Sequence, residues 1–132
     1  MSWPALLALA ISAASAGAML YIGLYQTRHV ARLWCPLFER GCERVADAPF
    51  ARPLGIPDGY LGAALYGLVV VLLLVSPDCS WTWFALMGLS MLAAIANAVG
   101  IYDMARLGSF CFYCVATALL SPVLLWAVWL LK

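Results

Sequence analysis

Four long apolar stretches constrain the fold of this sequence more than any other feature. Residues 3–25, 81–102 and 107–131 contain no Asp, Glu, Lys or Arg, and residues 60–75 form a shorter run of the same kind. A helix of about 20 apolar residues crosses the hydrocarbon core of a bilayer. Barrel strands would instead alternate apolar and polar residues, and these stretches do not. The sequence therefore predicts an all-α membrane protein with four transmembrane helices, at about residues 3–25, 60–75, 81–102 and 107–131.

The few charged residues leave no room for a second domain. They make up 10% of the 132 residues, whereas soluble domains carry about 25%. Most of them lie in residues 26–58, so we expect one membrane domain over residues 1–132. The net charge of +1 gives no basic surface for a nucleic acid, and the expected surroundings are a lipid bilayer. No basic residue precedes Arg28, which argues against a cleaved signal peptide at residues 3–25.

The lengths of the connections predict a four-helix bundle in which consecutive helices are antiparallel neighbours. Residues 76–80 and 103–106 are short connections, and residues 26–59 form one long loop between the first and second helices. Four helices place both termini on one side, so the long loop and the third-to-fourth connection share the other side. This topology brings Cys35 and Cys42 to the same membrane face as Cys111 and Cys114. Function is expected in that loop and at that face.

The cysteines are the candidate catalytic residues. Cys111 and Cys114 form a CxxC motif at the start of a helix, where residues three apart share a face and the helix N-terminus favours a thiolate. Three interpretations are open: a dithiol relay with Cys35 and Cys42, a four-thiolate zinc site, or structural disulfides. The relay is favoured, because six residues separate Cys35 from Cys42 and zinc sites prefer two to four. Cys79 is expected to be a free thiol in a turn.

A relay in a membrane needs an acceptor for two electrons. The sequence has no dinucleotide-binding glycine motif, no haem attachment motif and a single histidine, His29. The remaining acceptor is a quinone dissolved in the lipid, whose flat ring could enter between the helices and meet the CxxC motif. No metal site is expected.

The arrangement resembles the vitamin K epoxide reductase family over nearly the whole chain. The shared features are four helices, a cysteine pair in the first loop, and the CxxC motif that opens the fourth helix. Local signatures agree; they are residues 42–45 (CERV), residues 55–57 (GIP), Leu61-Gly62 followed by Tyr66, and residues 111–114 (CFYC) followed by Thr117. The bacterial quinone reductase of the Dsb type carries its two cysteine pairs in the reverse order. That order distinguishes the two families.

The resemblance implies roles for individual residues. Cys35 and Cys42 would accept electrons from a thioredoxin-like partner, Cys42 would form a mixed disulfide with Cys111, and Cys114 would face a quinone of the ubiquinone or menaquinone type. Because the chain ends at Lys132, we expect that partner to be a separate protein. By position, Asp58 matches a residue that hydrogen-bonds the quinone, and Phe50 matches a loop aromatic of the pocket. Ala118 stands where vertebrate members have a quinone-binding Tyr, which favours plain quinone reduction over epoxide chemistry.

Further quinone contacts are expected at Leu61, Asn97 and Tyr113. Leu61 belongs to the signature beside Asp58. Asn97 is a polar residue in the middle of a span, which marks either a site or a hydrogen bond between helices. Tyr113 either lines the pocket or belongs to the aromatic belt at the membrane interface.

The orientation in the cell membrane follows from the basic residues. The face with the cysteines carries six arginines and the other face only Lys132, so the positive-inside bias predicts a cytoplasmic active-site face. Disulfide formation normally belongs outside, and the disulfide-rich cytoplasms of hyperthermophiles are the exception. The alternative is an extracytoplasmic face. A non-enzymatic membrane protein, with structural or metal-binding cysteines, is the alternative to the whole interpretation.

Overall fold

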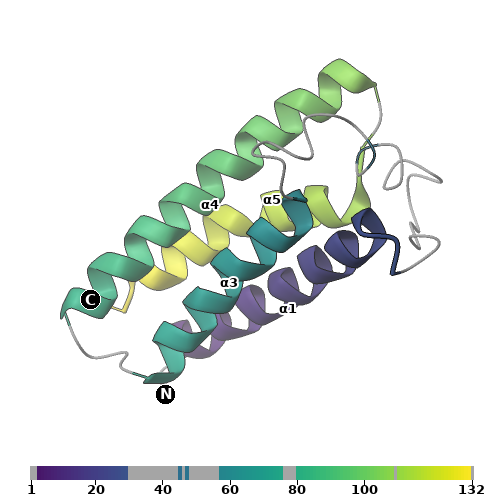
Figure 1. Ribbon diagram of the computed structural model, residues 1–132. Helices are drawn as coiled ribbons and strands as arrows, with labels where there is room; N and C mark the ends of the chain where they lie inside the picture. The colour runs from purple at the N-terminus through teal and green to yellow at the C-terminus, as the bar shows by residue number, and fades with distance from the viewer. Residues whose placement is uncertain are drawn as a thin grey trace.

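A computed structural model shows four helices that run up and down in one bundle (Figure 1). It describes residues 3–29, 45, 47, 57–75, 80–108 and 110–131. All four helices are long and apolar enough to cross a membrane. The predicted fold class is thereby confirmed. The helices are α1 (Trp3–Gln26), α3 (Asp58–Val75), α4 (Ser80–Leu107) and α5 (Phe112–Trp129).

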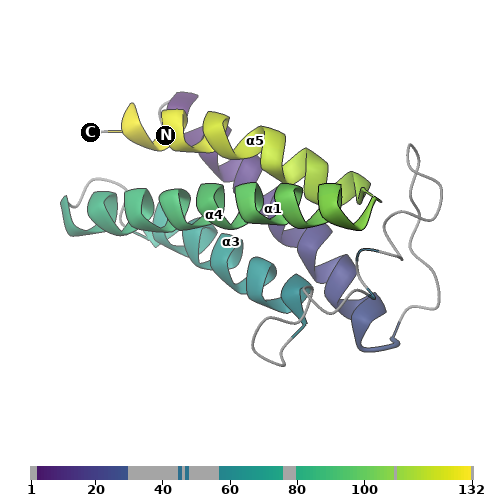
Figure 2. The ribbon, with the colours of Figure 1, turned by 90° about the horizontal axis from the view of Figure 1, so that it is seen from above.

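The packing order closes the bundle into a ring. Helix α1 lies along both α3 and α5 (Figure 2), and α4 lies along α5. Of the four neighbouring pairs, α3 and α4 pack least closely. The start of α1 and the end of α5 lie at the same end of the bundle, as the topology predicts. The opposite end holds Gln26, Asp58, Leu107 and Phe112, and we call it the CxxC end.

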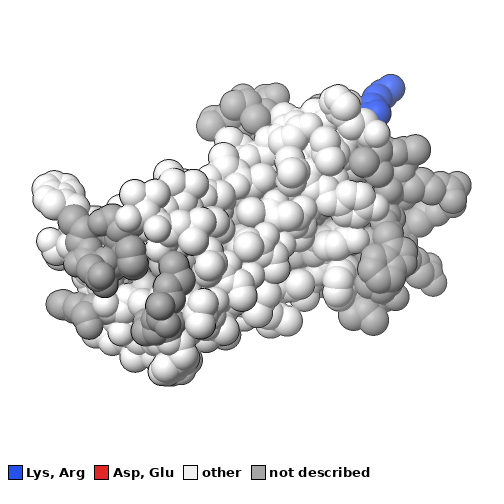
Figure 3. All heavy atoms as spheres, turned by 90° about the horizontal axis from the view of Figure 1, so that it is seen from below, with Lys and Arg blue, Asp and Glu red and all other residues white. Residues whose placement is uncertain are grey.

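The outer surface of the bundle is apolar. Large side chains such as Leu74, Leu119 and Ile95 are exposed, and the long body in Figure 3 shows no charged atoms among the described residues. Basic atoms appear only at one end in that view. The interior, by contrast, buries serine hydroxyls at Ser12 and Ser90. This distribution suits a chain whose solvent is lipid, because apolar side chains gain nothing there by turning inward.

The third helix is longer than the sequence indicated, and the prediction of a connection at residues 103–106 is wrong. Helix α4 continues to Leu107 and includes Asp103 and Arg106. It ends at Gly108, which has a φ of 81° and whose N–H bonds the carbonyl of Met104 over 2.9 Å. Charged residues commonly mark the end of a span, but Arg106 in the last turn of α4 also complements the helix dipole, so the helix can continue past Asp103. The fourth helix accordingly begins at Phe112 and not at residue 107.

Candidate active site

The CxxC motif forms the first turn of α5. Cys111 has extended backbone angles (φ −98°, ψ 125°) and precedes the first helical residue, Phe112, so it occupies the N-cap position. Its carbonyl accepts the first helical hydrogen bond, from Val115 N–H over 2.9 Å. Cys114 follows one turn later and is a free thiol. The motif therefore holds two sulfurs at the positive end of a helix dipole.

The two thiols have different surroundings. Cys111 is only 1% exposed, and its backbone N–H donates to the sulfur of Met104 over 3.3 Å. Cys114 is half-buried, and its side chain lines a cavity between the helices. Cys114 is therefore the thiol that a bound molecule would meet.

The cavity has a volume of about 420 Å³, within the range of about 300–1,000 Å³ that is usual for ligand sites. Its walls come mainly from α3 and α4, the neighbouring pair that packs least closely, with one residue each from α1 and α5. Most of the lining is apolar. The side chains that matter below are those of Met19, Asp58, Leu61, Tyr66, Asn97 and Cys114.

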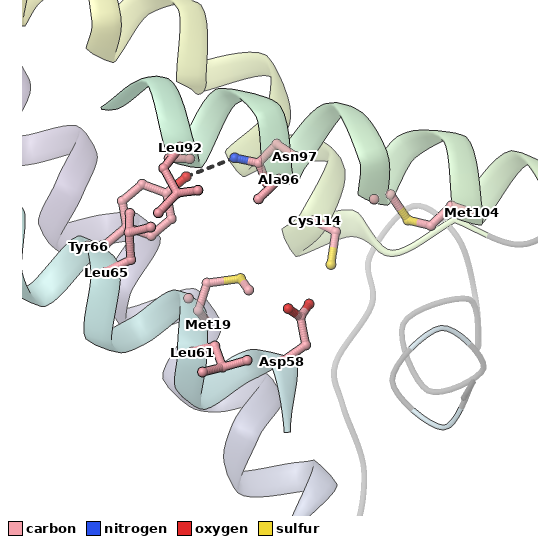
Figure 4. A pocket seen from close by; sticks show the side chains of 13 residues that line it. Met19, Asp58, Leu61, Leu65, Tyr66, Leu92, Ala96, Asn97, Met104 and Cys114 are labelled. Carbon is pink, nitrogen blue, oxygen red and sulfur yellow. Dashed lines mark hydrogen bonds between the residues drawn. The ribbon is translucent and has the colours of Figure 1, made fainter. Parts of the chain in front are cut away.

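Asp58 and Cys114 form one polar end of this cavity. They come from the first turns of two different helices, α3 and α5 (Figure 4). In Figure 4 the sulfur of Cys114 and the carboxyl group of Asp58 point into the same space, beside Met19. A flat apolar ring placed there would have a thiol and a hydrogen-bonding group at its edge.

Helix α1 fixes the position of Asp58. The side-chain oxygen of Gln26 accepts the backbone N–H of Gly59 over 3.0 Å and so caps the first turn of α3. A Cβ atom at Gly59 would lie 2.6 Å from the Cα of Gly23, which shows that the two backbones touch. Only glycine permits this approach.

Tyr66 and Asn97 form a second polar group of the cavity wall. Asn97 donates from its amide nitrogen to the hydroxyl oxygen of Tyr66 over 2.9 Å and to that of Ser121 over 2.6 Å. Thr117 donates to the carbonyl oxygen of Cys114 over 2.9 Å and reaches the Asn97 side-chain oxygen at 3.4 Å. The network joins α3, α4 and α5 and ends on the backbone of the CxxC motif.

A family comparison agrees with this geometry. The model of the vitamin K epoxide reductase family matches residues 5–129, nearly the whole chain. The chain belongs to that family. It is therefore a multi-pass membrane protein and a redox enzyme. A comparison with curated individual proteins gave no significant match.

Several residues that the sequence singled out meet in this vitamin K epoxide reductase fold. Cys114, Asp58, Leu61 and Asn97 line the one cavity. Asn97 lines this cavity and also hydrogen-bonds residues of two other helices, Tyr66 of α3 and Ser121 of α5. Cys35, Cys42, Phe50 and Cys79 lie outside the described residues.

Tyr113 is not part of the cavity lining, and Tyr66 lines the cavity although the sequence does not single it out. The ring of Tyr113 meets that of Tyr21 edge on, with centroids 5.6 Å apart, and is not among the described residues that line the cavity. In the sequence, Tyr66 belongs to a family signature and carries no other sign of a site. Its spacing of eight residues from Asp58 could have placed it on the same side of α3. Among the described residues, no three His, Cys, Asp or Glu gather to hold a metal ion.

Proposed function

We propose that this enzyme is a quinone-dependent thiol–disulfide oxidoreductase, which passes electrons from protein dithiols to a quinone of the ubiquinone or menaquinone type. One observation supports this best: Cys114 and Asp58 line the same largely apolar cavity between membrane-spanning helices. A lipid-soluble ring there would meet a nucleophile and a hydrogen-bonding group together.

The chemistry requires both cysteines of the CxxC motif. The Cys114 thiolate attacks a ring carbon of the quinone and forms a C–S bond. The Cys111 thiolate then attacks the sulfur of Cys114, so that an S–S bond forms and the C–S bond breaks. The electron pair of that bond stays on the ring, which takes up two protons and leaves as hydroquinone. One dithiol has become a disulfide, and one quinone has gained two electrons and two protons.

The loop cysteines then reduce the Cys111–Cys114 disulfide and return the CxxC motif to its dithiol form. The Cys42 thiolate attacks the sulfur of Cys111, which frees Cys114 and leaves a mixed disulfide. Cys35 then attacks Cys42 and frees Cys111. A thioredoxin-like partner reduces the resulting Cys35–Cys42 disulfide and is itself oxidised, so the enzyme drives disulfide formation in other proteins.

Asp58 is the proposed partner of a quinone oxygen, with Leu61 and Asn97 in the cavity wall and Phe50 and Tyr113 as further contacts. A carboxylic acid donates a hydrogen bond to a carbonyl, and its conjugate base accepts one from the hydroquinone. The same group can therefore serve substrate and product.

The direct test is reduction of menadione by the purified protein with a dithiol donor. Turnover is expected in the unaltered protein and in Cys79→Ala, and is expected to vanish in Cys114→Ala. Absence of turnover with several quinones, in folded and metal-free protein, would contradict the proposed function. Stoichiometric zinc in the purified protein would instead support a metal-binding role for the cysteines.

A further inference from the structure

In the hydrogen-bond network around Asn97, one donor hydrogen has no acceptor among the described residues. Ser121 donates its hydroxyl hydrogen to the carbonyl of Thr117 over 2.9 Å, so it can only accept from Asn97. Both amide hydrogens of Asn97 are then used, one on Ser121 and one on Tyr66. Thr117 uses its own hydrogen on the Cys114 carbonyl and the Asn97 side-chain oxygen. Every donor of these three residues therefore already has an acceptor.

Tyr66 is the exception. Its hydroxyl oxygen accepts from Asn97, and no acceptor among the described residues takes the hydroxyl hydrogen. The side chain is 3% exposed and lines the cavity. A buried hydroxyl without an acceptor is unfavourable, and at membrane depth no bulk water compensates it. The position calls for an acceptor inside the cavity.

The place of Tyr66 suits a second anchor for a ring held at Asp58. The two residues lie two turns apart on α3, roughly 12 Å along its axis. A helical side chain leans toward the helix N-terminus, so the Tyr66 hydroxyl reaches back toward the turn of Asp58. Figure 4 shows the hydroxyl near Asn97, on the far side of the cavity from Asp58, with Leu65 and Leu92 beside it. The cavity is thus polar at two places and apolar between them.

We propose that Tyr66 donates a hydrogen bond to the quinone carbonyl that lies away from Cys114 and Asp58, and that Asn97 is the positioning residue that holds the phenol in this role. The proposal rests on the proposed function, because it takes a quinone as the occupant. It involves a hydrogen bond and no proton transfer. Asn97 acts by donating to the phenol oxygen, which turns the phenol hydrogen into the cavity.

The test compares Tyr66→Phe with Tyr102→Phe, which removes the same hydroxyl from an exposed position of α4. In Tyr66→Phe the KM for menadione is expected to rise about tenfold, the effect of one lost hydrogen bond. The infrared band of one carbonyl of bound menadione is expected to move to higher frequency. The rate of thiol exchange should stay unchanged in both variants. Thermal stability should fall in Tyr66→Phe, because one amide hydrogen of Asn97 loses its acceptor, and should stay unchanged in Tyr102→Phe.

A second variant, Asn97→Asp, tests the same hydrogen bond if Tyr66→Phe does not fold. Asn97→Asp offers an acceptor at position 97, which draws the Tyr66 hydrogen away from the cavity. The same carbonyl band is then expected to move in the same direction. An unchanged KM and an unchanged band in a folded Tyr66 variant would overturn the inference, while turnover in the unaltered protein would leave the proposed function standing. Absence of menadione turnover in the unaltered protein would instead overturn both.

Discussion

The side-chain oxygen of Gln26 accepts a hydrogen bond from the backbone N–H of Gly59 over 3.0 Å, so the last turn of α1 caps the first turn of α3. Gln26 is 5% exposed, and the bond lies in the interior of the bundle. Because Asp58 is the first residue of α3, the same contact positions the residue whose carboxyl group lies at the polar end of the cavity. Helix α1 supplies little of the cavity wall. It nevertheless positions Asp58, one of the two polar groups at this end of the cavity.

Loss of this cap should lower the stability of the protein. Gln26→Leu leaves the Gly59 N–H buried without an acceptor, which lowers the free energy of unfolding by about 1–3 kcal/mol. Gln26→Glu keeps an acceptor at the same distance along the side chain but buries a carboxyl group, so it should lose less stability than Gln26→Leu without matching the unaltered protein. Thermal unfolding in detergent measures both. Equal stability of the Leu variant and the unaltered protein would show that the cap contributes nothing.

The contact between Gly23 and Gly59 predicts a sharp difference between two glycines of α3. Gly59→Ala would drive its Cβ into the backbone of α1, whereas a Cβ at Gly67 meets nothing within 4 Å. We expect Gly59→Ala to lose about 1–3 kcal/mol or to misfold, as overpacked sites do. Gly67→Ala should be neutral or gain up to about 1 kcal/mol from helix propensity. The same unfolding measurement applies, and comparable effects of the two substitutions would argue against the close approach.

Asp58 should matter through hydrogen bonding rather than charge alone. Asp58→Leu removes the carboxyl group from this end of the cavity, and we expect kcat/KM for menadione to fall about 10²-fold, as when one donor to a developing oxyanion is removed. Asp58→Asn keeps a donor and an acceptor and should retain most of the activity. The rate at which Cys114 is alkylated in both variants serves as the control, because an unchanged rate indicates that the CxxC motif keeps its position. A Leu variant with full activity would remove Asp58 from the site.

The two thiols of the motif should react at different rates. Cys111 is 1% exposed, while Cys114 is half-buried and faces the cavity. Membrane-permeant N-ethylmaleimide should therefore modify Cys114 first, and a bound quinone should slow this reaction. Peptide mass spectrometry after timed labelling resolves the two sites. Preferential labelling of Cys111 would contradict the assignment of Cys114 as the thiol that faces the quinone.

The membrane orientation can be tested at the loop. The arginines predict a cytoplasmic CxxC end, so a membrane-impermeant maleimide should label Cys42 only after the cells are permeabilised. Cys79, in the connection at the other end, should then be labelled in intact cells and serves as the internal control. Labelling of Cys42 in intact cells would place the CxxC end outside.

The residues of the candidate site were predictable to different degrees. Cys111 and Cys114 stand out in the sequence because two cysteines at helical spacing can form a disulfide, so that redox chemistry is one of the interpretations open to them. Asn97 also stands out, since a polar residue in the middle of a span always needs an explanation. Tyr66 does not, because an aromatic residue in an apolar helix has many ordinary roles. Only its contact with Asn97 and its place in the cavity wall distinguish it.

The sequence alone determined the number of membrane helices, their order and the end of the bundle that holds the CxxC motif. The reason is that a bilayer requires about 20 apolar residues per span, and charges mark most of the breaks. The tertiary structure decided which faces of these helices meet. In a helix that is apolar on every side, the hydrophobic periodicity does not indicate which face packs against the other helices. The sequence pattern therefore does not predict the cavity between α3 and α4. The end of α4 was decided in the same way, because Asp103 and Arg106 are compatible with a helix once it reaches the membrane surface.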